Sequence, residues 1–183
     1  MRSKVIILNG TSSAGKTSLA RALQGVTIEP FLHVKMDAFL EMMPPKYADH
    51  PDALTFLRVE GADPPEVEIL TGPYAARVLR GMRSAIVALA KDGLNIIVDD
   101  VFLEKEQAEY DRLLADYDVS FVRVDAALEV AEQREVARGD RDIGQARWQF
   151  SRVHQNVRYD FRVDTTDTAP DACARSIAAA LNL

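Results

Sequence analysis

The chain has 183 residues, of which 48 % are hydrophobic and 27 % are charged, with a formal net charge of −6 and a pI near 5.1. This size and composition predict a single globular domain over residues 1–183. The acidic balance argues against nucleic acid or an anionic membrane as the main partner. A lone cysteine, Cys173, excludes an internal disulfide and a cysteine-based metal site.

The amino-terminal segment contains only a short apolar run, residues 5–8, which is too short for a signal peptide. No stretch approaches the roughly 20 apolar residues of a membrane-spanning helix. We therefore expect a cytoplasmic protein with no membrane partner, in a compartment where ATP and Mg²⁺ are available.

Five short apolar runs are typical of strands buried on both faces. They are residues 4–9, 32–35, 95–99, 120–124 and 160–163. Helical patterns lie between them at residues 16–24, 73–91, 104–117, 126–138 and 144–154, and a last one begins near residue 170. Asp125 and Thr168 are predicted to cap the last two long helices. Strands that alternate with helices indicate an α/β fold with a parallel sheet.

Residues 44–73 do not fit this alternation, because they hold six of the eight prolines in the chain. An irregular stretch of this length is usually a lid or a binding loop. Apolar side chains such as Met43, Tyr47 and Phe56 favour a loop that covers a substrate. The alternative is a flexible insertion without function.

The string GTSSAGKT at residues 10–17 fits the phosphate-loop pattern G-x-x-x-x-G-K-[ST]. It lies between an apolar run and a helical pattern, which is the context that this motif requires. Lys16 would reach the β- and γ-phosphates of a nucleotide, and the Thr17 hydroxyl would ligate Mg²⁺. The predicted nucleotide-binding residues are Gly10, Ser12, Ser13, Ala14, Gly15, Lys16, Thr17 and Ser18. The alternative is a Gly/Ser-rich turn that only matches the string.

The remaining sequence narrows the class of nucleotide-binding protein. A GTPase should carry Asn-Lys-x-Asp late in the chain, and this string is absent. The chain is also too short for the accessory parts of most motor ATPases. A small-molecule kinase is therefore the favoured class.

Asp37 follows the second predicted strand, at the sheet edge where parallel α/β proteins bind ligands. A carboxylate there could accept the proton of an attacking hydroxyl group. Asp37 could also serve only as the N-cap of a short helix over residues 38–42.

Asp99 and Asp100 end the third predicted strand, in an arrangement that resembles a Walker B segment. Successive strand residues point to opposite faces, so one of the two should touch a metal ion. We assign Asp99 to Mg²⁺ and expect Asp100 to face the acceptor. The alternative is a capped turn into the next helix.

Six arginines and no lysine occur from Arg134 to Arg158. Arg134 and Arg138 are four residues apart on one helical face, and Arg141 follows a break at Gly139. Guanidinium groups suit phosphate oxygens, so residues 139–153 are predicted to form a lid that brings Arg138 and Arg141 to the transferred phosphate. For Arg147, Arg152 and Arg158 the alternative is a solvated face, with Glu132 and Glu135 as local partners.

With these residues in hand, the sequence resembles the chloramphenicol phosphotransferase family. The matching segments are IILNGTSSAGKT (6–17), DAFLEMMP (37–44), IIVDDVFL (96–103), REVARGDR (134–141), VHQNVRYD (153–160) and VDTT (163–166). The phosphate loop alone would not separate this family from other kinases, whereas the segments at Asp37 and Asp99 are more specific.

The resemblance implies an adenylate-kinase-like core with five parallel strands and transfer of the ATP γ-phosphate to an alcohol. In the family this alcohol is the primary hydroxyl group of chloramphenicol, which implies antibiotic inactivation. Asp37 takes the position of the catalytic base, and Arg134 would lie near the adenine. The match is poor over residues 47–72, so another small hydroxylated acceptor remains an alternative, as does a nucleotide-binding regulatory protein without transferase activity.

Overall fold

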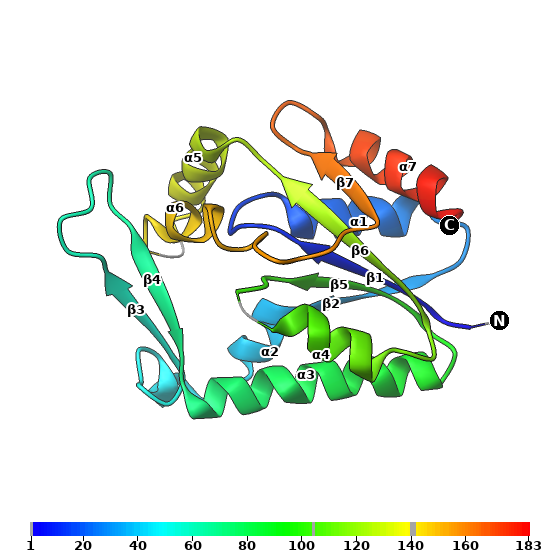
Figure 1. Cartoon of the computed structure of the whole chain (residues 1–183), viewed down its shortest axis with the longest axis horizontal. Coiled ribbons are helices and arrows are strands. Elements are labelled where there is room, and N and C mark those ends of the chain that lie inside the picture. Colours follow the sequence, from blue (N-terminus) through cyan, green and yellow to red (C-terminus); the bar gives the residue numbers. More distant parts are fainter. Residues whose placement is uncertain (1, 104, 140–141) are drawn as a thin grey trace.

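The computed structural model describes residues 2–103, 105–139 and 142–183. Its centre is a five-stranded parallel sheet in the order β2-β5-β1-β6-β7 (Figure 1). The strands are β1 (Lys4–Asn9), β2 (Phe31–Lys35), β5 (Asn95–Asp100), β6 (Asp118–Asp125) and β7 (Phe161–Asp164). Each overlaps one predicted apolar run, so the predicted α/β class with five parallel strands is confirmed.

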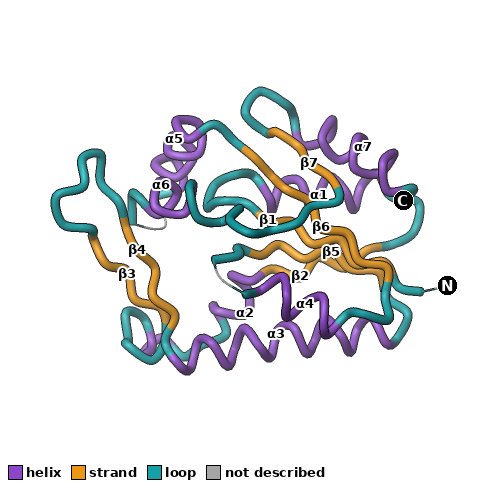
Figure 2. The backbone as a smooth tube through the Cα atoms, viewed as in Figure 1, coloured by secondary structure: helices purple, strands orange, loops and turns teal. Residues whose placement is uncertain are grey.

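Helices cover both faces of this sheet, as Figure 2 shows. They are α1 (Lys16–Val26), α2 (Met36–Glu41), α3 (Pro73–Lys91), α4 (Glu106–Leu113), α5 (Leu128–Arg138), α6 (Gln145–Phe150) and α7 (Pro170–Leu181), with a 3-10 turn at Pro45–Tyr47. No helix in the described part of the chain is long and apolar enough to cross a bilayer.

The alternation of side chains along β1 explains the two layers. Ile6 and Leu8 are buried in one core with residues of α1 and α7. Val5 and Ile7 are buried in the other core with residues of α3 and α4. Because both sets are apolar, the central strand needs cover on each face. Cys173 is buried in the first core.

The prediction that residues 44–73 are irregular was wrong. Strands β3 (Leu54–Arg58) and β4 (Val67–Thr71) form a separate antiparallel hairpin that extends from one end of α3 (Figure 1). Its register pairs Phe56 with Ile69, so each strand supplies the hydrogen bonds that the other lacks. The pairing partner lies more than ten residues away along the chain, and this is why a local pattern did not reveal the strands.

The predicted helix caps were also wrong. Helix α5 begins at Leu128 and α7 at Pro170, and neither has a side-chain cap. Asp125 instead accepts hydrogen bonds from Arg123 and Arg162. The observed α4 and α6 are shorter than the predicted helices 104–117 and 144–154, and the predicted start at residue 104 lies outside the described residues.

Candidate active site

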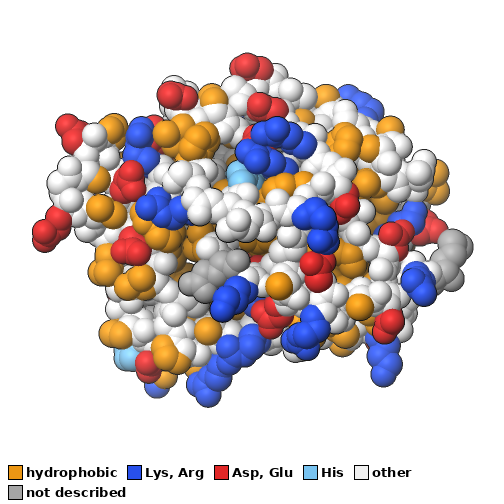
Figure 3. Space-filling model, viewed as in Figure 1, with side chains coloured by type: hydrophobic (Ala, Val, Ile, Leu, Met, Phe, Trp, Pro, Cys, Tyr) orange, Lys and Arg blue, Asp and Glu red, His pale blue; other side chains and the backbone are white. Residues whose placement is uncertain are grey.

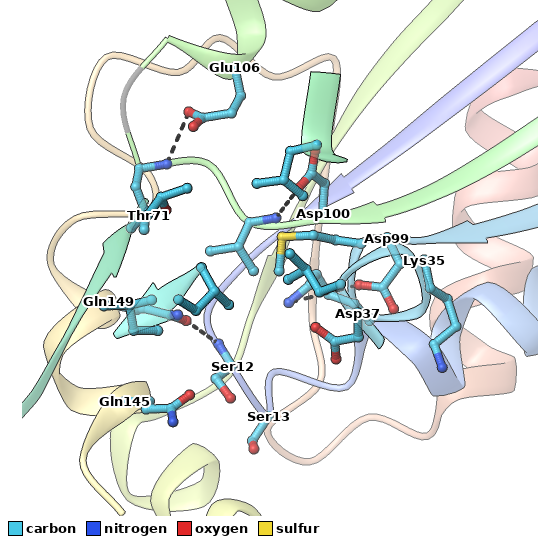
Figure 4. A pocket seen from close by; sticks show the side chains of 18 of the residues that line it. Ser12, Ser13, Lys35, Asp37, Thr71, Asp99, Asp100, Glu106, Gln145 and Gln149 are labelled. Carbon is cyan, nitrogen blue, oxygen red and sulfur yellow. Dashed lines mark hydrogen bonds and ion pairs between the residues drawn. The ribbon is translucent and has the colours of Figure 1, made fainter. Parts of the chain in front are cut away.

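The carboxyl ends of β1, β2 and β5 meet at one edge of the sheet. The register places Asp99 between Leu8 on β1 and Lys35 on β2. The phosphate-loop motif after β1 and Asp37 after β2 therefore come to the same place as Asp99. A cavity of about 1330 Å³ lies between this edge, α2, α3, the hairpin and α6. Figure 4 shows polar side chains from the sheet edge, α2, the hairpin and α6 around it.

The motif residues form a loop between β1 and α1, which begins directly at Lys16. A Cβ atom on Gly10 would lie 2.3 Å from the Val124 carbonyl oxygen, so only glycine allows the loop to leave the strand here. The Lys16 Nζ atom donates to the carbonyl oxygens of Gly10 and Thr11, at 2.8 and 2.9 Å. These bonds hold the ammonium group across the front of the loop, facing the cavity.

Thr17 and Asp99 are in direct contact. The Thr17 hydroxyl donates to Asp99 Oδ2 at 2.6 Å, and Lys16 Nζ lies 4.0 Å from Asp99 Oδ1. Burial raises the pKa of Asp99, but the neighbouring His33, the Lys16 charge and the Thr17 hydroxyl outweigh burial and leave this pKa below its ordinary value. Asp99 is thus a carboxylate that is already paired with a hydroxyl group.

Asp37 lies in the first turn of α2 and lines the cavity together with Lys16 and Asp99 (Figure 4). Helix α2 starts at Met36 with Lys35 as its N-cap residue, so the alternative of Asp37 as an N-cap is wrong. The side chain is half-buried. The chain that follows β2 therefore delivers a carboxylate to the cavity.

Asp100 differs from its neighbour. Its carboxylate is 1 % exposed and accepts hydrogen bonds from the Tyr110 hydroxyl and the Val101 amide, both at 2.8 Å. Burial raises the pKa of Asp100 to about 6, although the nearby Arg83 charge opposes the increase. Arg83 lies against the Tyr110 ring and pairs with Glu109 at 3.0 Å. Asp100 is therefore bonded within the cavity wall and is among the residues that line the cavity, and its contact with an acceptor stays a prediction.

Two of the predicted arginines, Arg134 and Arg138, belong to α5. Arg134 donates to the Thr165 carbonyl oxygen at 2.7 Å, and the Thr165 hydroxyl donates to the Ala14 carbonyl oxygen at 2.8 Å. Arg134 thus supports the loop through Thr165. Arg138 is exposed and lines the cavity. Arg141 lies outside the described residues.

Two further charged residues of this region, Arg147 and Glu135, have structural partners. Arg147 pairs with Glu132 at 2.6 Å, as the solvated-face alternative predicted. Glu135 was expected to partner an arginine, but it is fully buried. Its two carboxylate oxygens accept the backbone amides of Gly144 and Ala146, at 2.8 and 2.9 Å. Glu135 therefore anchors the start of α6.

Sequence reasoning missed the two glutamines of α6. Gln145 and Gln149 are both buried and both line the cavity. The Gln149 Oε1 atom accepts the backbone amide of Ser12 at 2.6 Å, so this side chain touches the phosphate loop. Their spacing of four residues, which places them on one helical face, was the available signal, but no known motif points to it.

The site has groups suited to a nucleotide and to Mg²⁺. Among residues 2–103, 105–139 and 142–183, no cluster of three His, Cys, Asp or Glu side chains could hold a metal ion by itself. Mg²⁺ bound to a nucleotide usually takes only one or two protein ligands, because phosphates and water complete its shell. The paired Thr17 hydroxyl and Asp99 carboxylate offer two oxygen atoms that fit this requirement.

Comparisons with known proteins agree with this geometry. The family model described as "Chloramphenicol phosphotransferase-like protein" matches residues 3–182. A Mycobacterium tuberculosis H37Rv protein named "Putative O-phosphotransferase Rv2636" is 35 % identical over 180 residues, which cover 95 % of this chain and 80 % of the relative.

Solved kinases share the fold at lower identity. The Mycobacterium tuberculosis APS kinase CysC, in complex with AMPPNP and APS, has a TM-score of 0.66 and 19 % identity, covering 100 % of this chain and 99 % of its own. A gluconokinase from Sinorhizobium meliloti 1021 has a TM-score of 0.61 and 14 % identity, and the match covers 99 % of this chain and 92 % of the gluconokinase. The shikimate kinase from Acinetobacter baumannii, in complex with shikimate, has a TM-score of 0.57 and 14 % identity, and the match covers 94 % of this chain and 89 % of the shikimate kinase. The predicted P-loop kinase fold is thus confirmed.

Proposed function

Because the chain belongs to the chloramphenicol phosphotransferase-like family and is a P-loop phosphotransferase, we propose that it transfers the γ-phosphate of ATP to a hydroxyl group of a small molecule. One observation carries the proposal. A single cavity contains the phosphate loop with Lys16, the Thr17–Asp99 pair and the Asp37 carboxylate. Donor and acceptor can therefore meet in one cavity.

The proposed nucleotide site uses the loop residues 10–18, with Lys16 against the β- and γ-phosphates. Thr17 and Asp99 would hold Mg²⁺, which neutralises phosphate charge when it is bound. Arg134, which supports the loop through Thr165, would lie near the adenine. Arg138, at the end of α5, would act on the phosphates together with Arg141 of the proposed lid, residues 139–153.

The proposed chemistry is an in-line displacement. Asp37 accepts the proton of the acceptor hydroxyl while its oxygen forms a bond to the γ-phosphorus. The bond between the γ-phosphorus and the β–γ bridging oxygen breaks, and ADP leaves with that oxygen. Lys16 and Arg138 stabilise the charge that spreads over the transferred group. The use of ATP is consistent with a cytoplasmic location.

The acceptor would occupy the part of the cavity lined by the segment 44–73 and by α3. Leu40, Leu54, Phe56 and Leu79 line it with apolar surface, which suits a small molecule with a mainly apolar body and a reactive alcohol. Chloramphenicol is our first candidate, and phosphorylation of it would inactivate the antibiotic.

The test is incubation of the purified protein with Mg-ATP and chloramphenicol, followed by mass spectrometry. We expect an adduct of one phosphoryl group and stoichiometric ADP. A panel of other alcohols, including gluconate, shikimate and nucleosides, identifies a different acceptor. If ATP is hydrolysed slowly and no alcohol gains phosphate, the transferase proposal is wrong and a nucleotide-binding regulatory role is favoured.

A further inference from the structure

The side-chain amide of Gln149 lies directly on the phosphate loop. It projects from α6, is 4 % exposed, and lines the same cavity as Lys16 and Asp37. Figure 4 shows it facing Ser12, with the hydrogen bond between them marked. This contact joins the lid segment to the loop that would hold the triphosphate.

The orientation of this amide follows from its partner. The Ser12 backbone N–H is a donor, so the Gln149 oxygen must face it, and the bond is 2.6 Å long. The two N–H groups of Nε2 then point elsewhere. Within the described parts of the chain, no hydrogen bond to Nε2 accompanies the bond of Oε1. The two N–H groups of Gln149 Nε2 are therefore available as donors to a group bound in the cavity.

The helix that carries Gln149 is held in place at its start. Buried Glu135 accepts the amides of Gly144 and Ala146. The Val67 amide donates to the Gly144 carbonyl oxygen at 3.1 Å. At Gly144 φ is +112°, and a Cβ there would lie 2.6 Å from the Pro65 carbonyl oxygen, so a side chain would separate α6 from the hairpin. These contacts fix the position of Gln149 before any ligand binds.

We propose that Gln149 is a catalytic residue, whose Nε2 donates a hydrogen bond to an oxygen of the transferred phosphoryl group while Oε1 stays on the Ser12 amide. The inference rests on the proposed function. A neutral donor held rigidly at this place stabilises charge that develops during transfer and needs no reorganisation at that moment. The amide also sets the distance between the lid and the loop.

The test compares Gln149→Met, which has a similar size but no donor, with the wild type. We expect kcat to fall about 10²- to 10³-fold, the usual loss for one such donor. ADP lacks the γ-phosphate, so its affinity should stay within about twofold if Gln149 acts on the transferred group. Gln133→Met, on the exposed face of α5 outside the cavity, should behave as the wild type.

The variant Gln149→Glu distinguishes the acceptor role of Oε1 from the donor role of Nε2. Its carboxylate can still accept the Ser12 amide, but it offers no donor to phosphate. We expect a kcat at least as low as that of Gln149→Met, and a weaker binding of ADP as well, because the added negative charge on the loop repels the phosphates. An unchanged kcat in Gln149→Met would overturn the proposal. A loss of ADP affinity in Gln149→Met equal to its loss of kcat would overturn it too, because that result describes only support of the loop.

The proposed function can fail independently of this inference. If the wild type binds ATP but phosphorylates no alcohol, transfer of the γ-phosphate to water becomes the measured reaction. The same decrease in Gln149→Met and Gln149→Glu then supports the inference, and equal hydrolysis rates contradict it. Melting temperatures near that of the wild type show that each variant is folded.

Discussion

The wall that carries the phosphate loop and the wall that carries the hairpin are built in different ways. The loop wall depends on backbone groups: Lys16 is held by two carbonyl oxygens, and Ala14 is held through Thr165. The hairpin wall presents side chains from β3, β4 and α3, and hydrophobic side chains are also visible on its outer surface at the left of Figure 3. Backbone groups favour a ligand common to many proteins, whereas side chains determine which particular molecule fits.

The two walls meet at α6 and at the sheet edge. Helix α6 contacts β4 through Gly144 and contacts the loop through Gln149. Asp37 stands between the walls, on the turn after β2. Substitutions on one wall, on the other and at their junction should therefore affect different kinetic constants.

The largest effect is expected at the junction. Asp37→Asn should lower kcat about 10²- to 10⁴-fold, the usual span for a general base, because the amide cannot accept the hydroxyl proton. ATP affinity should change little. Steady-state kinetics and nucleotide titration measure the two quantities, with Asp92→Asn on the exposed end of α3 as the control. Turnover near the wild-type rate would place the base elsewhere.

On the loop wall, Lys16→Ala should weaken the binding of ATP and ADP about 10- to 100-fold. This range corresponds to the loss of charged hydrogen bonds worth about 1.5–3 kcal/mol. Turnover should fall as well, since we propose that the same ammonium group stabilises the transferred phosphate. Lys91→Ala, at the exposed end of α3, is the matched control. Unchanged nucleotide affinity in Lys16→Ala would contradict the nucleotide site.

On the hairpin wall, Phe56→Ala should raise the KM of the acceptor about tenfold and leave the KM of ATP unchanged. The half-buried ring lines the cavity, and the loss of part of its apolar contact is worth about 1–2 kcal/mol. Leu57→Ala is the control, because Leu57 points away from the cavity on the same strand and is 43 % exposed. An equal change in both KM values would show that the walls are not separable.

The smallest expected effect is on the pH dependence of stability, and it comes from His154, which lies behind the loop wall. His154 contacts the Tyr159 hydroxyl, to which Asn9 at the end of β1 also donates. Burial, aided by the Arg123 charge, lowers the pKa of His154 to about 4, although Asp125 opposes the decrease. The imidazole of His154 therefore binds a proton more weakly in the folded protein than in the unfolded chain. The contribution of neutral His154 to the stability of the fold is complete above about pH 6.5, and it is lost as the pH falls from there toward 4.

Melting temperatures at pH 7 and pH 5 test this expectation. The decrease between the two should be smaller in His154→Asn, which keeps a hydrogen-bonding group but cannot take up the proton. Asn156→Asp would not be informative, because it adds a new charge to an exposed turn. Equal decreases in His154→Asn and the wild type would show that His154 does not contribute to acid sensitivity.

Local patterns were sufficient for most of the sheet and for the loop wall. Runs of apolar residues such as 4–9 and 95–99 predicted buried parallel strands, because such strands need apolar side chains on both faces. The phosphate-loop string and Asp37 follow strands directly in the chain, and Asp99 lies at the end of a strand. Since parallel strands end at one edge, their meeting in space followed from their place in the sequence.

Only the tertiary structure decided the contacts between segments that are separate in the chain. Residues 54–58 become a strand because residues 67–71 pair with them, and Asp100 is bonded within the wall because Tyr110 reaches it. Gln149 meets Ser12 across 137 positions of sequence. No local periodicity encodes such pairs, because their energy comes from packing and from satisfying buried polar groups once the chain has folded.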